Sequence, residues 1–248
     1  MTTSPEIFSI AGADGVRIVG DRLGDPSAPA AIFLHGGGQT RRSWGRAASA
    51  VAQRGWQAIT LDFRGHGESD WSSDGDYRVT VDIVPDMDQS GASRIHSFMF
   101  DRMKSGFDSL DEVADMIQEY NPHRPRPTDL DGLRTNLRSR DGRWYWHWDP
   151  KFIDGTAALP PIEVTEVDRM HAAVQAIIDA GVPMLLVRGQ MSDLVTKERA
   201  DEFLARFPQV DFVDVGGAGH MVAGDRNDLF AGAIVDFLAR HGDSASRT

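Results

Sequence analysis

Residues 35–38 read His-Gly-Gly-Gly and residues 62–69 read Asp-Phe-Arg-Gly-His-Gly-Glu-Ser, and a short apolar run precedes each of them. The two runs, 30–34 and 57–61, have the length and composition of buried strands. Small apolar residues recur between them at helical spacing. A strand, a glycine-rich turn, a helix and a second strand in this order predict a mostly parallel sheet covered by helices.

The last third of the chain repeats this alternation of strands and helices. Short apolar runs at 184–187 and 210–215 predict two more buried strands. Helices with one apolar face are expected at 170–178, 200–207 and 229–238. We therefore expect one α/β core built from the two ends of the chain, 1–84 and 169–248.

The middle of the chain differs, because helical stripes follow one another there without buried strands. Apolar side chains recur at helical spacing over 92–103 and 110–117, and a capping box that starts at Ser109 opens the second helix. The aromatic run 144–148 comes later. We expect an all-helical insertion, a lid, over 85–168 between the two parts of the core.

Composition excludes several classes of protein. The 248 residues include 26 Lys and Arg against 37 Asp and Glu, a formal net charge of −11 that would repel a nucleic acid, so we expect no such partner. No cysteine is present, which rules out disulfides and thiolate chemistry. The histidines form no metal-binding pair of the usual spacing, and we expect neither metal nor cofactor. The sequence has no leader pattern or long apolar segment, so we expect a cytoplasmic protein and no membrane partner.

The glycine run 36–38 has a chemical interpretation as well as a structural one. Consecutive glycines let the backbone turn so that N–H groups face a cleft, and such groups stabilise a developing oxyanion. Gly37, with help from Gly38, is the candidate for that role. The alternative is an ordinary flexible turn, which a short motif of this kind does not exclude.

The two quoted motifs, each directly after a strand, together resemble the α/β-hydrolase family, most closely its lidded esterase, haloperoxidase and epoxide-hydrolase branch. The resemblance implies that Asp193, after the strand 184–187, is the catalytic acid and that His220, in the loop 216–220, is the catalytic histidine. A carboxylate that fixes the tautomer of an imidazole makes it a competent general base. The alternative is that Asp193 caps the helix near Thr196 and that His220 is an ordinary loop histidine.

The nucleophile that this family requires, a serine in Gly-x-Ser-x-Gly on a strand-to-helix turn, is not found. Ser69 and Ser93 each lack the second glycine. Only 20 residues separate Asp62 from Asp82, whereas two βαβ crossovers of about 30 residues each should lie there. The central nucleophile strand and its helix are therefore predicted to be missing, a block of roughly 40–50 residues near Thr80. A true deletion and a sequence joined across a gap both explain this.

The aromatic residues Trp144, Trp146 and Trp148 share one face if their segment is extended. We interpret them first as packing of the lid on the core, because large aromatic side chains dominate burial. The functional alternative makes Trp146 part of an apolar wall of the substrate pocket.

Three functions remain open on the sequence. The first is hydrolysis of a small, fairly apolar ester-like substrate, with His220 as the base, Asp193 orienting it and the serine outside this chain. The second is a catalytically inactive relative that keeps a ligand pocket under its lid. The third is a lyase-like reaction in which the same histidine and aspartate act as general base without a nucleophile. A small-molecule ligand is expected in each case, and the oligomeric state stays open.

Overall fold

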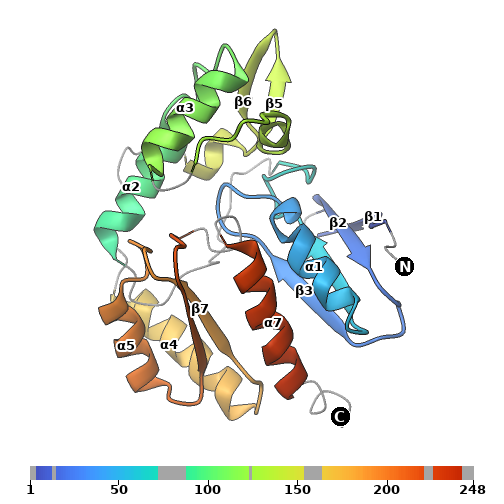
Figure 1. Ribbon diagram of the computed structural model, residues 1–248, viewed down its shortest axis with the longest axis vertical. Helices are drawn as coiled ribbons and strands as arrows, with labels where there is room; N and C mark the ends of the chain where they lie inside the picture. Colours follow the sequence, from blue (N-terminus) through green and yellow to red (C-terminus); the bar gives the residue numbers. More distant parts are fainter. Residues whose placement is uncertain are drawn as a thin grey trace.

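The computed structural model describes residues 4–12, 15–71, 88–122, 125–153, 164–220 and 226–241 (Figure 1). The two ends of the chain form a core, and the middle of the chain, which we call the lid, lies on one side of it. Strands and helices alternate along both core parts, so the predicted α/β architecture is confirmed. The expected boundary between 84 and 85, and Thr80, lie outside the described residues. None of the described helices is long and apolar enough to cross a membrane.

The N-terminal part of the core is a four-stranded sheet with a helix packed on it. Its elements are β1 (Glu6–Ala11), β2 (Arg17–Leu23), β3 (Ala30–Leu34), the 3-10 turn η1 (Arg41–Trp44), α1 (Gly45–Ala52) and β4 (Gln57–Leu61). The strand order is β1-β2-β4-β3, in which β3 and β4 pair in parallel and the other two pairs are antiparallel. Ala47, Ala48 and Val51 of α1 are fully buried, because they form the apolar stripe that faces the core.

β3 is the last strand of this sheet among the described residues. A strand in the middle of an α/β sheet is normally covered on both faces. The side chains of Ile32 and Leu34, however, are 61% and 42% exposed. The sheet therefore stops at β3 with large apolar side chains in contact with solvent.

The C-terminal part of the core has its own pair of strands. Its elements are α4 (Val164–Asp179), β7 (Leu185–Gly189), α5 (Lys197–Arg206), β8 (Asp211–Val215) and α7 (Asn227–His241). β7 and β8 pair in parallel as a separate two-stranded sheet. The two core parts meet where α7 packs on α1, with the rings of Trp44 and Phe230 5.3 Å apart (Figure 1). The expected boundary between 168 and 169 falls inside α4.

The lid contains two helices and a β-hairpin, so the prediction of an all-helical insertion is wrong. Its elements are α2 (Gln89–Phe100), α3 (Leu110–Tyr120), η2 (Asp131–Asn136), β5 (Leu137–Arg140), β6 (Arg143–Trp146) and η3 (Pro150–Ile153). Asp141 and Gly142 join β5 to β6 with φ angles of 52° and 77°, the two positive values that a tight hairpin turn requires. The aromatic residues that follow favour a strand over a helix.

The predicted cap of the second lid helix is present, in a modified form. The hydroxyl of Ser109 accepts a hydrogen bond from the Glu112 N–H at 3.1 Å. The carboxylate of Glu112 reaches back to the N–H of Asp108 at 2.8 Å, one residue earlier than in a standard capping box. Two of the backbone donors at this helix start are thus satisfied by side chains.

Candidate active site

The glycine loop lies directly under the lid. A Cβ atom on Gly37 would stand 3.2 Å from the ring of Phe152, and one on Gly38 would stand 2.9 Å from the methyl group of Met99. Gly38 also has a φ of +74°, a conformation that favours glycine. The backbone conformation of Gly38 therefore favours glycine, and a side chain at Gly37 would require the Phe152 ring to move by a few tenths of an ångström.

The N–H and the carbonyl of Gly38 both form hydrogen bonds with histidine side chains. Its N–H donates to Nε2 of His66 at 3.2 Å, and its carbonyl accepts from Nε2 of His147 at 3.2 Å. Among the described residues no such partner is found for the N–H of Gly37. The role in oxyanion binding predicted for these glycines stays a prediction, with Gly37 as the amide that the geometry leaves available.

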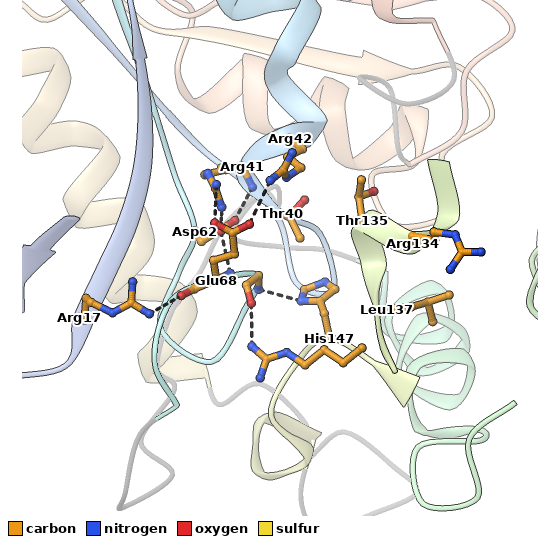
Figure 2. Close-up of a pocket in the computed structure, with 12 residues that line it drawn as sticks. Arg17, Thr40, Arg41, Arg42, Asp62, Glu68, Arg134, Thr135, Leu137 and His147 are labelled. Atoms are coloured by element: carbon orange, nitrogen blue, oxygen red, sulfur yellow. Dashed lines mark hydrogen bonds and ion pairs between the residues drawn. The ribbon is translucent and has the colours of Figure 1, made fainter. Parts of the chain in front are cut away.

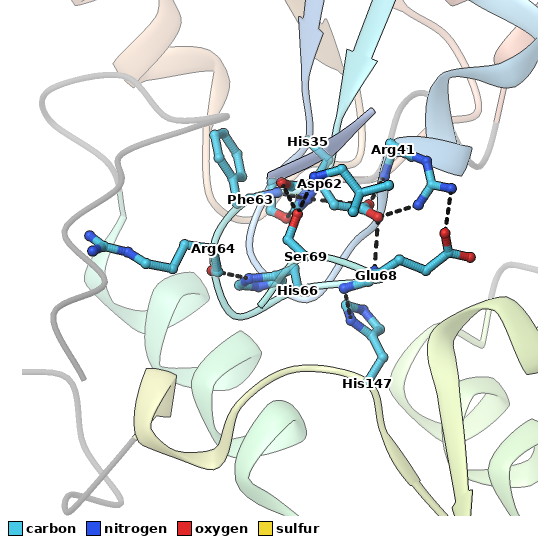
Figure 3. Close-up of polar contacts among 12 residues, drawn as sticks. His35, Arg41, Asp62, Phe63, Arg64, His66, Glu68, Ser69 and His147 are labelled. Carbon is cyan, nitrogen blue, oxygen red and sulfur yellow. Dashed lines mark hydrogen bonds and ion pairs between the residues drawn. The ribbon is translucent and has the colours of Figure 1, made fainter. Parts of the chain in front are cut away.

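Three buried histidines join the loops at this place (Figure 3). Nε2 of His35 accepts from the Phe63 N–H at 3.0 Å, and Nδ1 of His147 accepts from the Gly67 N–H at 2.8 Å. In each ring, as in His66, one nitrogen accepts a backbone N–H and the other faces a carbonyl. Each imidazole is therefore neutral with a fixed tautomer, and protonation would break a bond.

The environment of these histidines keeps them neutral. Burial lowers the pKa of His66 to about 4, and the neighbouring His35 lowers it further in the same direction. Burial, with a smaller effect of His66, lowers the pKa of His147 to about 3. Burial also lowers the pKa of His35. His147 comes from the lid and the other two from the core, so the contact between lid and core depends on uncharged imidazoles.

The loop 62–69 is held by its own hydrogen bonds. The carboxylate of Asp62, which is fully buried, accepts the N–H groups of Arg41 at 2.7 Å and Glu68 at 3.0 Å and pairs with the Arg41 guanidinium (Figure 3). Gly67 has a φ of +53°, and a Cβ atom there would collide with the Asp62 carboxylate. The motif thus builds a rigid turn around the buried carboxylate of Asp62.

The serine that ends this motif also has a structural role. Ser69 is 2% exposed. Its hydroxyl donates to the carbonyl of Asp62 at 2.7 Å and accepts from the Val19 N–H at 2.9 Å. The side chain therefore ties the turn to β2, and its proton is directed away from the glycine loop.

The candidate acid, Asp193, lies against the first lid helix. Its carboxylate is 29% exposed and forms an ion pair with the guanidinium of Arg94 at 2.5 Å. A Cβ atom on Gly91 would collide with the carbonyl of Asp193, and the Asp88 N–H donates to the Leu194 carbonyl at 2.9 Å. The N-terminus of α2 is thus packed on the acid loop.

The alternative that Asp193 caps the following helix is wrong. The cap of α5 is Thr196, whose hydroxyl accepts from the Arg199 N–H at 3.3 Å. The carboxylate of Asp193 instead points to the lid helix that carries Arg94.

The loop that carries His220 lies beside the acid loop. The Met191 N–H donates to the Ala218 carbonyl at 2.9 Å, and the Gln190 N–H donates to the Val215 carbonyl at 3.0 Å. His220 itself is half-buried and is the last described residue of its segment. The structure brings the two predicted loops together, and the catalytic roles of Asp193 and His220 stay predictions.

Trp146 lies inside the lid. It is 6% exposed, stacks on Trp148 at 4.8 Å and meets the edge of Phe107 at 5.1 Å. Its Nε1 donates to the carbonyl of Asp101 at 3.3 Å. These contacts belong to the lid's own core rather than to the packing of the lid on the core of the fold. The lid aromatic rings that face the glycine loop are those of Phe152, at Gly37, and Trp148, at Gly38.

The chain is similar to several known proteins. A family model described as alpha/beta hydrolase fold matches residues 29–126. The chain is 26% identical to the esterase Rv0045c of Mycobacterium tuberculosis (strain ATCC 25618 / H37Rv), over 81% of this chain and 79% of that protein. It is 24% identical to the sn-1-specific diacylglycerol lipase ABHD11 of Mus musculus, over 87% and 83%. This chain has the α/β-hydrolase fold.

A solved α/β hydrolase from Novosphingobium aromaticivorans DSM 12444 gives the same fold assignment. It superposes with a TM-score of 0.75 at 19% identity, over 97% of this chain and 100% of that one. The resemblance predicted from the two glycine-rich motifs is therefore confirmed at the level of the α/β-hydrolase fold.

Proposed function

We propose that this chain is an esterase-type α/β hydrolase for small, fairly apolar esters, and that the segment carrying the nucleophile is missing from it. In this proposal Gly37 donates its N–H to the oxyanion, His220 acts as the base and Asp193 orients His220. The hydroxyl that attacks the substrate belongs to the missing segment, so the chain as it stands forms no acyl-enzyme. In this proposal the protein is located in the cytoplasm, where a chain without cysteine needs no disulfide.

The interrupted sheet carries this proposal. The first sheet ends at β3, the second consists of β7 and β8, and no described strand joins them. A parallel strand between β3 and β7 would pair with both and would help to cover Ile32 and Leu34. Each apolar side chain left in water forgoes about 25 cal/mol per Å² of surface that burial would gain.

The lengths of the two sequence alignments support the same interpretation. They span 255 and 271 positions, yet include only 81% and 87% of the 248 residues of this chain. About 50 positions of each alignment therefore face no residue of this chain. This agrees with the block of roughly 40–50 residues that the crossover lengths predict near Thr80.

We expect the chain to resist a fluorophosphonate probe, because covalent labelling requires an activated serine. The measurement is the intact mass after incubation with the probe, with a known serine esterase as positive control. Labelling of a serine in this chain, abolished by His220→Ala, would contradict the proposal.

Restoring the missing segment tests the proposal by a gain of activity. A strand, a Gly-x-Ser-x-Gly turn and a helix, in the order that the family requires, would be inserted at Thr80. We expect this chimera to accept one fluorophosphonate and to hydrolyse a short p-nitrophenyl ester. Matched chimeras with the inserted serine changed to alanine, or with His220→Ala, should lose both properties. A chimera that folds, by circular dichroism and cooperative unfolding, but stays unlabelled would overturn the assignment of His220.

The ion pair between Arg94 and Asp193 favours a second candidate, an inactive relative that keeps only a ligand pocket. A guanidinium on the acid competes with the imidazole that the acid would orient. If the chimera gains activity only when Arg94→Gln is added, the ion pair between Arg94 and Asp193 is what prevents ester hydrolysis. If neither chimera hydrolyses the ester, the inactive relative is the better assignment.

A further inference from the structure

A cavity lies between the core and the lid hairpin (Figure 2). Its volume is about 670 Å³, within the range of small-molecule sites. One wall comes from η1 and the loop after β4, and the other comes from η2 and β5. Neither Asp193 nor His220 lines it, so an inference about this cavity is independent of the proposed function.

The charge of this cavity is opposite to that of the chain. Five arginines line it, Arg17, Arg41, Arg42, Arg134 and Arg138, against the two acids Asp62 and Glu68. The whole chain has a formal net charge of −11. Asp70, Asp21 and Asp131 lie outside the lining and pair with Arg17, Arg41 and Arg134, so Arg42 and Arg138 are the lining arginines that attract an anion to this place.

We propose that this cavity binds the phosphoryl group of a small ligand, either a phosphate monoester or inorganic phosphate. Arg42 lines the cavity from the core, and Arg134 and Arg138 line it from the lid. A phosphoryl group presents three or four oxygens in divergent directions and can accept from opposite walls at once. A carboxylate presents two oxygens in one plane and suits a single guanidinium.

The guanidinium groups facing the cavity keep donors for a ligand. Arg42 is 49% exposed and contacts Glu68 at 3.0 Å through one of its nitrogens. Arg134 is 52% exposed, and its partner Asp131 is 81% exposed, so this pair is screened and a ligand can compete for it. Arg138 donates to the carbonyl of Gly67 at 2.7 Å and forms no ion pair with a described residue.

The negative charge of Glu68 repels an anion and therefore limits the affinity of the cavity for phosphate. Its carboxylate lines the cavity and bonds to Arg41 at 2.8 Å and to Arg42. Neutralising Glu68 while keeping its shape would leave the arginines in place and remove the repulsion. Glu68→Gln is therefore expected to bind phosphate several-fold more tightly, a direction that a purely structural role of Glu68 does not give.

The test is calorimetric titration of the full chain with inorganic phosphate and with phenyl phosphate, using benzoate as the carboxylate control. We expect both phosphates to bind and benzoate to bind at least ten-fold more weakly. Tighter binding of phenyl phosphate identifies a monoester as the ligand, and equal binding identifies the free ion. Failure of both phosphates to bind at millimolar concentration would overturn the proposal.

Variants of arginines inside and outside the cavity test whether phosphate binds there. Arg42→Gln and Arg138→Gln should each weaken phosphate binding about ten-fold, the loss expected for a charged donor. Arg54→Gln removes the same charge from an exposed position after α1, away from the cavity, and should leave the affinity within two-fold. Equal losses in all three variants would mean that phosphate follows net charge alone and would contradict the site. Unfolding curves of each variant check that the fold is retained.

Discussion

Replacing Asp62 with asparagine is expected to lower the free energy of unfolding by about 3–5 kcal/mol, the loss seen when one partner of a buried ion pair is removed. Arg41 is 1% exposed and Asp62 fully buried, so neither charge can turn to water. An asparagine amide would also bring N–H groups toward the N–H groups of Arg41 and Glu68 that the carboxylate now accepts. Unpaired buried donors cost more than the lost bond.

Urea unfolding at pH 7, followed by far-UV circular dichroism, measures this loss. The matched control is Asp70→Asn, because Asp70 also pairs with an arginine but both partners are about half exposed, Arg17 at 52% and Asp70 at 49%. That variant should lose no more than about 1 kcal/mol. Similar small losses in the two variants would mean that the buried pair does not hold the loop 62–69.

Local patterns predicted the parts of the fold that local chemistry determines. Strand-forming runs followed by glycine-rich turns placed 30–38 and 57–69 correctly, because burial and the need for glycine leave a direct trace in the residues. The hairpin in the lid also left a trace, Asp141-Gly142 between alternating side chains, a typical two-residue turn. It was missed because the neighbouring helical stripes dominated the interpretation of the segment.

The partners of the site could not be predicted in the same way, because they are distant in the chain. His147 bonds to Gly67 and Gly38 across sequence separations of 80 and 109 residues. Arg94 meets Asp193 from a different element altogether. No periodicity in a sequence reports such pairs, and a histidine between two tryptophans is typical of simple packing. Only the position of the lid on the core reveals that these side chains act together.

The second large effect is a dependence of stability on pH that arises from the buried histidines. In the folded protein the pKa values of His66 and His147 are about 4 and about 3, whereas an unfolded histidine titrates near 6.5. Between these values the unfolded chain binds protons that the folded chain does not. Stability therefore falls as the pH drops below about 6.5, by up to about 1.4 kcal/mol per pH unit for each such histidine, and the loss ends near the folded pKa.

Urea unfolding at pH 7, 6 and 5 measures this slope above the titration of ordinary carboxylates. In His147→Asn the amide oxygen can still accept the Gly67 N–H, so the variant keeps a hydrogen bond and loses one titrating group. Its slope should be smaller than that of the parent by up to about 1.4 kcal/mol per pH unit. His241→Gln, on the surface end of α7, should retain the steep fall. A parent slope that persists unchanged in His147→Asn would show that the lid is not held to the core by a neutral imidazole.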